Sequence, residues 1–179
     1  MKNKKILILG SKEDYSLENM YKRAFKFYGI RTDLFHVYDI EKGFFKKFLW
    51  KYLRFIEFYL IRRKIISYFR SNQINYDLVV IFKGLYLNKN VLKIIKDSLK
   101  GAKFINIFPD NPLDINYFKD ISNYNILKII PYFDNIFIYS KIILKRLRLR
   151  YPKTNFHYLP FAHDNQIHKK FLSYHKNKN

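Results

Sequence analysis

Several polar residues of this sequence stand directly after apolar runs, where a strand would give way to a loop. Asp110 lies between two prolines that fix an irregular loop after the run over residues 103–108. A carboxylate in such a loop can act as a general base or orient a substrate hydroxyl. An Asx turn or a helix cap is the alternative role for Asp110. Asn111 follows it and is a further candidate for lining the same cleft.

Two glycines also follow apolar runs. Gly84 and Lys83 close the run over residues 77–82. Glycine there would let a ligand approach the backbone, while the lysine would meet an anionic group. Gly10 and Ser11 close the first run and could bring backbone N–H groups to a ligand at a helix N-terminus. A tight turn is the alternative for each pair, and SKED after the first glycine excludes the dinucleotide fingerprint G-x-G-x-x-G.

The histidines give little support for a metal site. Four of the five cluster near the C-terminus without Cys or Glu beside them, namely His157, His163, His168 and His175. Because zinc sites usually combine such ligands at characteristic spacings, we expect no metal in this protein. No Ser–His–Asp order with a nucleophile elbow is present either. His163 is instead a candidate for the mouth of a cleft, since it follows the last predicted strand.

The elements that would position these residues alternate along the chain. Near-continuous apolar runs predict strands over residues 4–11, 32–38, 77–82, 103–108, 135–139 and 155–161. Helical spacing predicts helices over 17–28, 44–70, 88–99 and 141–150, and a loop with weak helix over 113–131. This alternation predicts an α/β, Rossmann-like, mainly parallel sheet with helices on both faces. Ligands of such sheets bind at the carboxyl ends of the strands, where Ser140 joins the residues above.

Composition limits the possible partners. The 179 residues suffice for one domain with a core, and an apolar content of 49% excludes wholesale disorder. The absence of Cys excludes a disulfide framework, a thiolate zinc site and a cysteine nucleophile. With 35 Lys and Arg against 14 Asp and Glu, the net charge of +21 implies attraction to something anionic. No export signal or membrane-spanning run is visible, so we expect a cytoplasmic protein, either free or peripheral at the inner face of the membrane.

A basic, aromatic segment over residues 41–70 leaves three alternatives. It holds nine Lys and Arg against two Glu. The segment could be a core helix with a solvated basic face, a surface for anionic lipid, or a nucleic-acid site. Without an RRM, KH or helix-turn-helix signature, we expect no specific nucleic-acid partner. The residues of the lipid or polyanion surface would be Lys46, Lys47, Lys51, Arg54, Arg62 and Arg63.

Taken in order, the strand-end motifs resemble a known family. They are KILILG at residues 5–10, YDLVVIFKG at 76–84, FPDNP at 108–112, YFDNIF at 132–137 and YLPFAHD at 158–164, with His168 after them. This succession resembles the N-terminal half of the CgeB-like, spore-maturation type glycosyltransferases of the GT-B fold. The resemblance covers roughly residues 4–168, nearly the whole chain.

The resemblance implies an acceptor-side domain over residues 1–164, with 165–179 as a hinge remnant or polar tail. In that family a second domain binds the nucleotide sugar, and this sequence has no counterpart of it, so no cofactor is expected on this chain alone. Asp110 would be the base or acceptor-hydroxyl partner. The cleft would be lined by Gly10, Ser11, Lys83, Gly84, Asn111, Ser140 and His163. Whether the chain is an enzyme half completed by a donor-domain partner, a fragment, or a binding remnant without turnover stays open.

Overall fold

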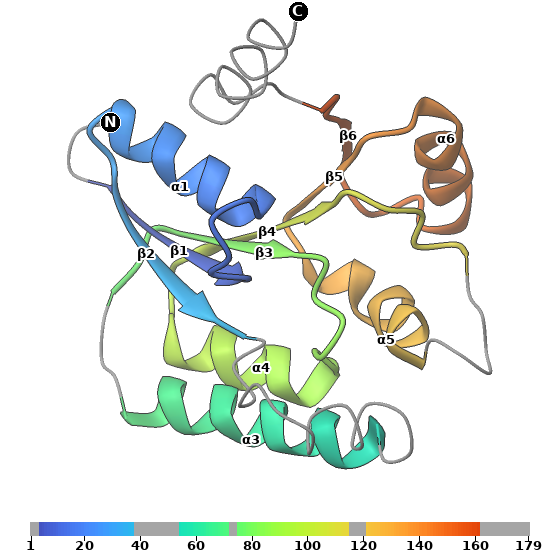
Figure 1. Cartoon of the computed structure of the whole chain (residues 1–179). Coiled ribbons are helices and arrows are strands. Elements are labelled where there is room, and N and C mark those ends of the chain that lie inside the picture. The colour runs from blue at the N-terminus through green and yellow to red at the C-terminus, as the bar shows by residue number, and fades with distance from the viewer. Residues whose placement is uncertain (1–3, 38–53, 72–74, 115–120, 162–179) are drawn as a thin grey trace, which may run out of the picture.

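A computed structural model describes residues 4–37, 54–71, 75–114 and 121–161, without the side chains of 54, 55 and 121–124. Six strands form one sheet in the order β2-β1-β3-β4-β5-β6, and every pairing is parallel (Figure 1). The strands are β1 Lys5–Gly10, β2 Arg31–His36, β3 Leu78–Phe82, β4 Lys103–Phe108, β5 Asn135–Ile138 and β6 Phe156–Tyr158. The expected α/β, Rossmann-like architecture is therefore confirmed.

The central strands are apolar on both faces because helices cover both faces. Leu7 and Ile8 are adjacent in β1 and point to opposite sides, yet neither is exposed. Val79 and Val80 repeat this arrangement in β3. An apolar run without alternation is the pattern of a parallel strand buried on both sides, which is why these strands were predictable.

The helices divide between the two faces of the sheet. α1 Leu17–Phe27 packs on one face through residues that include Tyr21 and Phe25, whereas α3 Arg54–Ser71 and α4 Lys89–Ser98 cover the other (Figure 1). The apolar core on the face covered by α3 and α4 also includes residues of α5 Ile121–Ile129, of the 3-10 turn Ile130–Tyr132 and of α6 Lys141–Arg150. Three helices begin at a side-chain cap that accepts a backbone N–H, namely Ser16, Asn88 and Ser140.

The sequence prediction differs from the structure in two places. The helix expected over 44–70 agrees with α3 from Arg54 onward, and residues 44–53 lie outside the described residues. Helix α5 occupies much of the segment 113–131, where a loop with weak helix was expected. The consecutive apolar residues Ile126 and Leu127 of α5 are both buried, and such a run hides the helical period. The last strand is three residues long, shorter than the predicted 155–161. The expected tail over 165–179 lies outside the described residues.

Carboxylates tie the amino ends of the strands together. Asp77 Oδ2 accepts the Lys5 N–H at 2.8 Å, and Asp134 Oδ2 accepts the Phe104 N–H at 2.6 Å. In return, the backbone N–H groups of both aspartates donate to the carbonyls of Lys5 and Phe104. These reciprocal bonds continue the strand pairing beyond the last ladder residues.

A polar cluster lies at the same amino end, between β1 and β2. Lys5 Nζ is 3.0 Å from Asp33 Oδ2, and the Tyr76 hydroxyl donates to the same oxygen at 2.8 Å. Partial burial acts to raise the pKa of Asp33, but the hydrogen bonds and charge of its neighbours outweigh it, so its pKa is lowered. Burial and the bond to Asp33 raise the pKa of Tyr76. The cluster is thus built to keep the carboxylate charged and the phenol neutral.

Candidate functional site

The strand order places a topological switch point between β1 and β3. The chain leaves β1 toward β2 on one side and returns to pair β3 on the other side. In open α/β sheets, ligands bind in the crevice outside the carboxyl ends of the strands at such a point. The loop after β1 and the loop after β3 border this crevice, and both contain predicted site residues.

The loop after β1 is closed by its own side chains. Glu18 is only 7% exposed, and its Oε1 accepts the Ser11 N–H at 3.0 Å. A Cβ atom added at Gly10 would overlap the Glu18 side chain. Ser16 Oγ caps α1 and donates to the Ser11 carbonyl at 3.2 Å. Gly10 is therefore required by the close approach of a carboxylate, and the predicted Gly10-Ser11 pair presents no open amide of Ser11 to a ligand.

His36, which the sequence did not single out, extends this closure. Its Nδ1 atom lies 3.0 Å from the Lys12 backbone N–H, which donates to it, and 3.3 Å from the Gly10 carbonyl. His36 is the last residue of β2, so the bond joins the ends of two neighbouring strands through the loop. No pattern in the sequence indicated this role, because the partner lies 24 residues away.

The loop after β3 begins with two residues in left-handed backbone conformation. Lys83 has φ 56° and Gly84 has φ 76°. Among the described residues, Lys83 is the one residue other than glycine with a positive φ. A left-handed conformation costs a residue with a Cβ about 1–2 kcal/mol. Strain of this kind persists where the surroundings hold it, and it clusters at functional sites.

Three contacts hold Lys83 in place. Its N–H donates to the Ile107 carbonyl at 3.0 Å, and its carbonyl accepts from Asn106 Nδ2 at 3.4 Å. Its Nζ atom lies 2.7 Å from Asp110 Oδ2, which belongs to the loop after β4. Two predicted site residues from neighbouring strand ends are thus brought into direct contact.

The loop after β4 separates the roles of its two polar residues. Asn111 Oδ1 accepts the Leu113 N–H at 3.0 Å, and its carbonyl accepts the Asp114 N–H at 3.2 Å. Asn111, rather than Asp110, therefore makes the Asx turn that the sequence left as an alternative for Asp110. The Asp110 side chain is 59% exposed and pairs with Lys83.

Asn106 supports this arrangement from inside the core. It is 3% exposed, and its amide donates to the Ile81 carbonyl at 3.0 Å as well as to Lys83. The amide thereby satisfies carbonyls at the point where β3 turns away from β4. Sequence reasoning missed it, because a single Asn inside an apolar strand looks like an interruption of the pattern.

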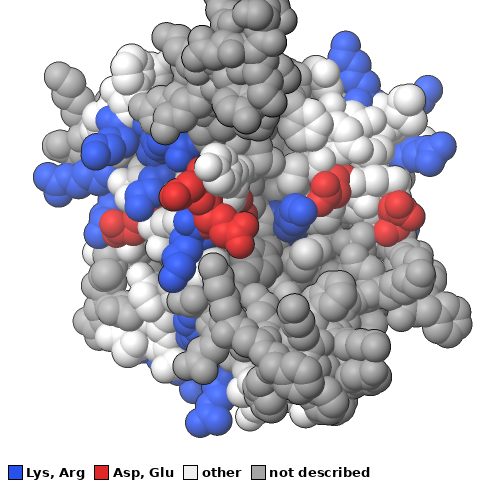
Figure 2. Space-filling view, in the orientation of Figure 1, with Lys and Arg blue, Asp and Glu red and all other residues white. Residues whose placement is uncertain are grey.

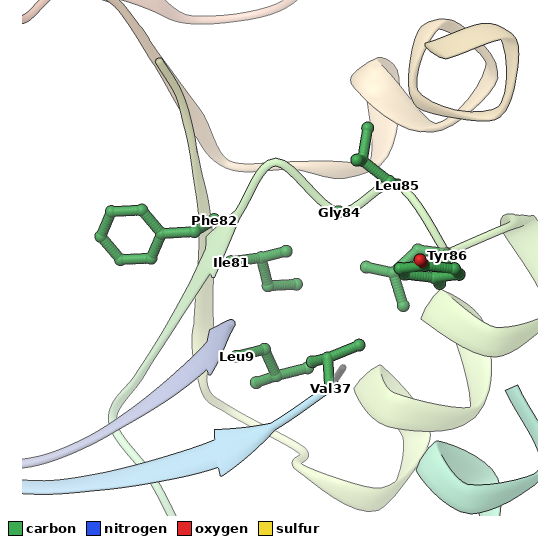
Figure 3. Close-up of a pocket in the computed structure, with 8 residues that line it drawn as sticks. Leu9, Val37, Ile81, Phe82, Gly84, Leu85 and Tyr86 are labelled. Atoms are coloured by element: carbon green, nitrogen blue, oxygen red, sulfur yellow. The ribbon is translucent and has the colours of Figure 1, made fainter. Parts of the chain in front are cut away.

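A small apolar pocket lies beneath the loop after β3 (Figure 3). Leu9, Val37 and Ile81 point into it, whereas Phe82 points away toward the other face. The lining residues are Leu9, Val37, Ile81, Phe82, Gly84, Leu85, Tyr86 and Leu87. Its cavity volume is ≈ 10 Å³, about what one water molecule needs. The pocket is therefore a small packing gap at the edge of the core and is too small for a substrate.

The predicted basic surface is only partly described. Lys46, Lys47, Lys51 and the side chain of Arg54 lie outside the described residues. Arg63 is exposed on α3. Arg62 instead packs inward: its Nε donates to the Tyr86 carbonyl at 3.0 Å, its guanidinium lies over the Phe58 ring, and burial lowers its pKa. Arg62 therefore anchors the loop after β3.

Two further predicted cleft residues are Ser140 and His163. Ser140 lies at the carboxyl end of the sheet, after β5, and its Oγ accepts the Ile143 N–H at 3.4 Å as the cap of α6. His163 lies outside the described residues. Among the residues that the structure describes, no group of three or more His, Asp or Glu could hold a metal ion.

No protein-family model matches this chain, and no curated protein is significantly similar to it. The resemblance to CgeB-like glycosyltransferases accordingly stays a prediction that depends on the strand-end motifs. What the structure adds is the fold and the contact between Lys83 and Asp110 at the switch-point edge.

Proposed function

We propose that this chain is the acceptor-side domain of a glycosyltransferase of GT-B architecture. A Rossmann-like sheet alone hosts many activities, so the proposal must depend on the site. The observation that carries it is the ion pair between Lys83 Nζ and Asp110 Oδ2, 2.7 Å long, at adjacent strand ends beside the switch point. Both residues belong to the cleft that the family resemblance implies.

The charge of this edge supports a sugar hydroxyl as the ligand. Of the acidic residues that the structure describes, Glu13, Asp14, Asp110 and Asp114 lie in the loops after β1 and β4, and Glu18 lies in the first turn of α1. Figure 2 shows acidic side chains near the middle of one face, with Lys and Arg side chains among and around them. Carboxylates accept hydrogen bonds from hydroxyl groups and repel phosphates. A strongly basic protein with an acidic edge is therefore better suited there to a neutral, hydroxyl-rich acceptor than to a polyanion.

The proposed reaction assigns one step to Asp110. Its carboxylate accepts the proton of the acceptor hydroxyl while that oxygen forms a bond to the anomeric carbon of a nucleotide sugar. The bond from this carbon to the diphosphate breaks, and the nucleoside diphosphate leaves with the electron pair. Lys83 orients the carboxylate, and Asn106 holds the backbone of Lys83. The donor would be bound by a second domain or a partner chain, and no residue described above is assigned to it.

Binding is tested first with this chain alone. Labelled backbone amides are followed by NMR while oligosaccharides or glycolipid headgroups are added. We expect chemical-shift changes at Lys83, Gly84 and Asp110 and none at the amino end of the sheet. A ligand that shifts only amino-end residues, or no response to any acceptor class, would contradict the proposed location.

Catalysis is then tested with a donor-binding domain supplied in trans and a radiolabelled nucleotide sugar. Asp110→Asn should lower transfer by about 100-fold or more, the usual contribution of a general base. Asp97→Asn is the matched control, because Asp97 is an exposed carboxylate on α4 away from the crevice. Equal transfer by the two variants would remove Asp110 from the mechanism.

A further inference from the structure

Helix α6 has an apolar stripe on its exposed side as well as on its buried side. Ile143, Leu144 and Leu147 are buried against the sheet. Ile142 and Leu149 are 70% and 77% exposed. They are seven residues apart, nearly two full turns, so they share one stripe about 10 Å long. At about 100° per residue, this stripe lies on the side of the helix opposite to Leu147.

Every charged residue of α6 is basic. Lys145 and Arg146 are exposed and flank the stripe of Ile142 and Leu149, one on each side. The helix carries three further cations at Lys141, Arg148 and Arg150. No Asp or Glu occurs from residue 135 to residue 163. Basic side chains separated by uncharged surface are visible at the upper right of Figure 2, in the region of α6.

We propose that this face of α6 is a docking surface for a membrane rich in anionic lipid. Aliphatic side chains between cations match the boundary of headgroups and acyl chains, where the apolar stripe is buried and the cations meet the phosphates. A nucleic acid would use the cations but would gain nothing from Ile142 and Leu149, because aliphatic side chains do not stack on bases. The charge and the apolar stripe together therefore favour lipid.

The helix would lie in the plane of the membrane surface. It has ten residues, and among the described residues no helix is long and apolar enough to cross a membrane. The proposal places the surface on α6 and not on the segment 41–70, for which attachment to lipid was one of three alternatives. It goes beyond glycosyl transfer and does not depend on it.

Vesicle flotation of the full chain tests the proposal. Vesicles of phosphatidylcholine alone are compared with vesicles that also contain phosphatidylglycerol. Three double variants are compared with the unchanged chain: Lys145→Glu with Arg146→Glu, Ile142→Ser with Leu149→Ser, and the control Lys93→Glu with Lys100→Glu. The control residues are exposed on and just after α4, and they change the net charge by the same amount. Circular dichroism verifies that each variant is folded.

We expect flotation only with the anionic vesicles. The Lys145 and Arg146 variant should lower the partition coefficient by about tenfold or more, because each basic residue at the surface contributes about 1 kcal/mol. The Ile142 and Leu149 variant should lower it by at least about threefold through lost apolar burial. The Lys93 and Lys100 control should change it by less than about twofold.

Two results would overturn the proposal. Equal loss of flotation in the α6 charge variant and the Lys93 and Lys100 control would mean that overall charge, and no particular face, drives binding. Flotation of the Ile142 and Leu149 variant at the level of the unchanged chain, together with single-stranded RNA binding that needs Lys145 and Arg146, would assign the face to nucleic acid.

Discussion

The two ends of the sheet use acidic side chains in different ways. At the amino end, Asp77 and Asp134 accept backbone N–H groups of neighbouring strands at 2.8 and 2.6 Å. At the carboxyl end, Asp110 is 59% exposed and contacts a lysine whose backbone is left-handed. All three aspartates are exposed, but the first arrangement ties carboxylates to the backbone of neighbouring strands, whereas the second pairs a carboxylate with a lysine side chain next to the crevice. The bonds that tie strands together thus lie at one end of the sheet, and the site of the proposed function lies at the other.

Gly10 and Glu18 are where this contrast is weakest, because Glu18 at the carboxyl end also accepts a backbone N–H. Gly10→Ala should lower the free energy of unfolding by about 2–3 kcal/mol, since the new methyl group must displace a buried carboxylate. Urea unfolding measures the change. Gly10→Ala and Glu18→Ala are also combined in one double variant. The sum of the losses in unfolding free energy of the two single variants should exceed the loss of the double variant by at least about 0.5 kcal/mol. Strict additivity would show that Glu18 is not what excludes a side chain at position 10.

The contrast itself is tested by removing one aspartate from each end. Asp134→Ala should lower the free energy of unfolding by about 1 kcal/mol, because the hydrogen bond of this exposed carboxylate to the partly buried Phe104 N–H is lost. Asp110→Ala should lower it by less than about 0.5 kcal/mol, since its ion pair is exposed. Chemical denaturation of both variants under one buffer condition gives the comparison. Similar costs at the two ends would contradict it.

Lys83, at the carboxyl end, is a residue whose replacement should increase stability. Lys83→Gly should raise the free energy of unfolding by about 0.5–1 kcal/mol, because glycine adopts the left-handed conformation without steric strain. The lost exposed ion pair subtracts little from this gain. Thermal unfolding measures it, and Lys83→Met, which keeps a Cβ, is the control and should show no gain. A destabilised Lys83→Gly variant would mean that Lys83 serves stability rather than the site.

The smallest expected effect concerns pH and the amino-end cluster of Lys5, Asp33 and Tyr76. The folded pKa of Asp33 is lowered below its ordinary value of 3.8, so its contribution is fully present above that value. The contribution is lost as the pH falls through the lower, folded pKa. Because Asp33 is half exposed, its size should stay below about 1 kcal/mol. Unfolding measured from neutral to acidic pH should show a shallower decline for Asp33→Asn, and an unchanged slope would contradict this.

The sequence predicted the strands and the positions of strand-end residues, but it did not predict which of these residues touch. Apolar runs such as residues 78–82 specify a buried parallel strand without reference to any partner. The contact of Lys83 with Asp110 depends on the register of β3 against β4 and on a left-handed backbone. Sequence reasoning missed Asn106 and Glu18 because their roles exist only once two elements are packed.

The strand order also fixes how the sheet grows while the chain is being made. From β3 onward, each new strand pairs with the strand before it, so the sheet lengthens from one side only. The newest strand always leaves unpaired N–H and C=O groups that could pair with another molecule. These successive strands shorten from six residues in β4 to four in β5 and three in β6. Among the described residues, the sheet therefore ends on that side at its shortest strand, whereas a chain interrupted after residue 108 would expose a longer strand to aggregation.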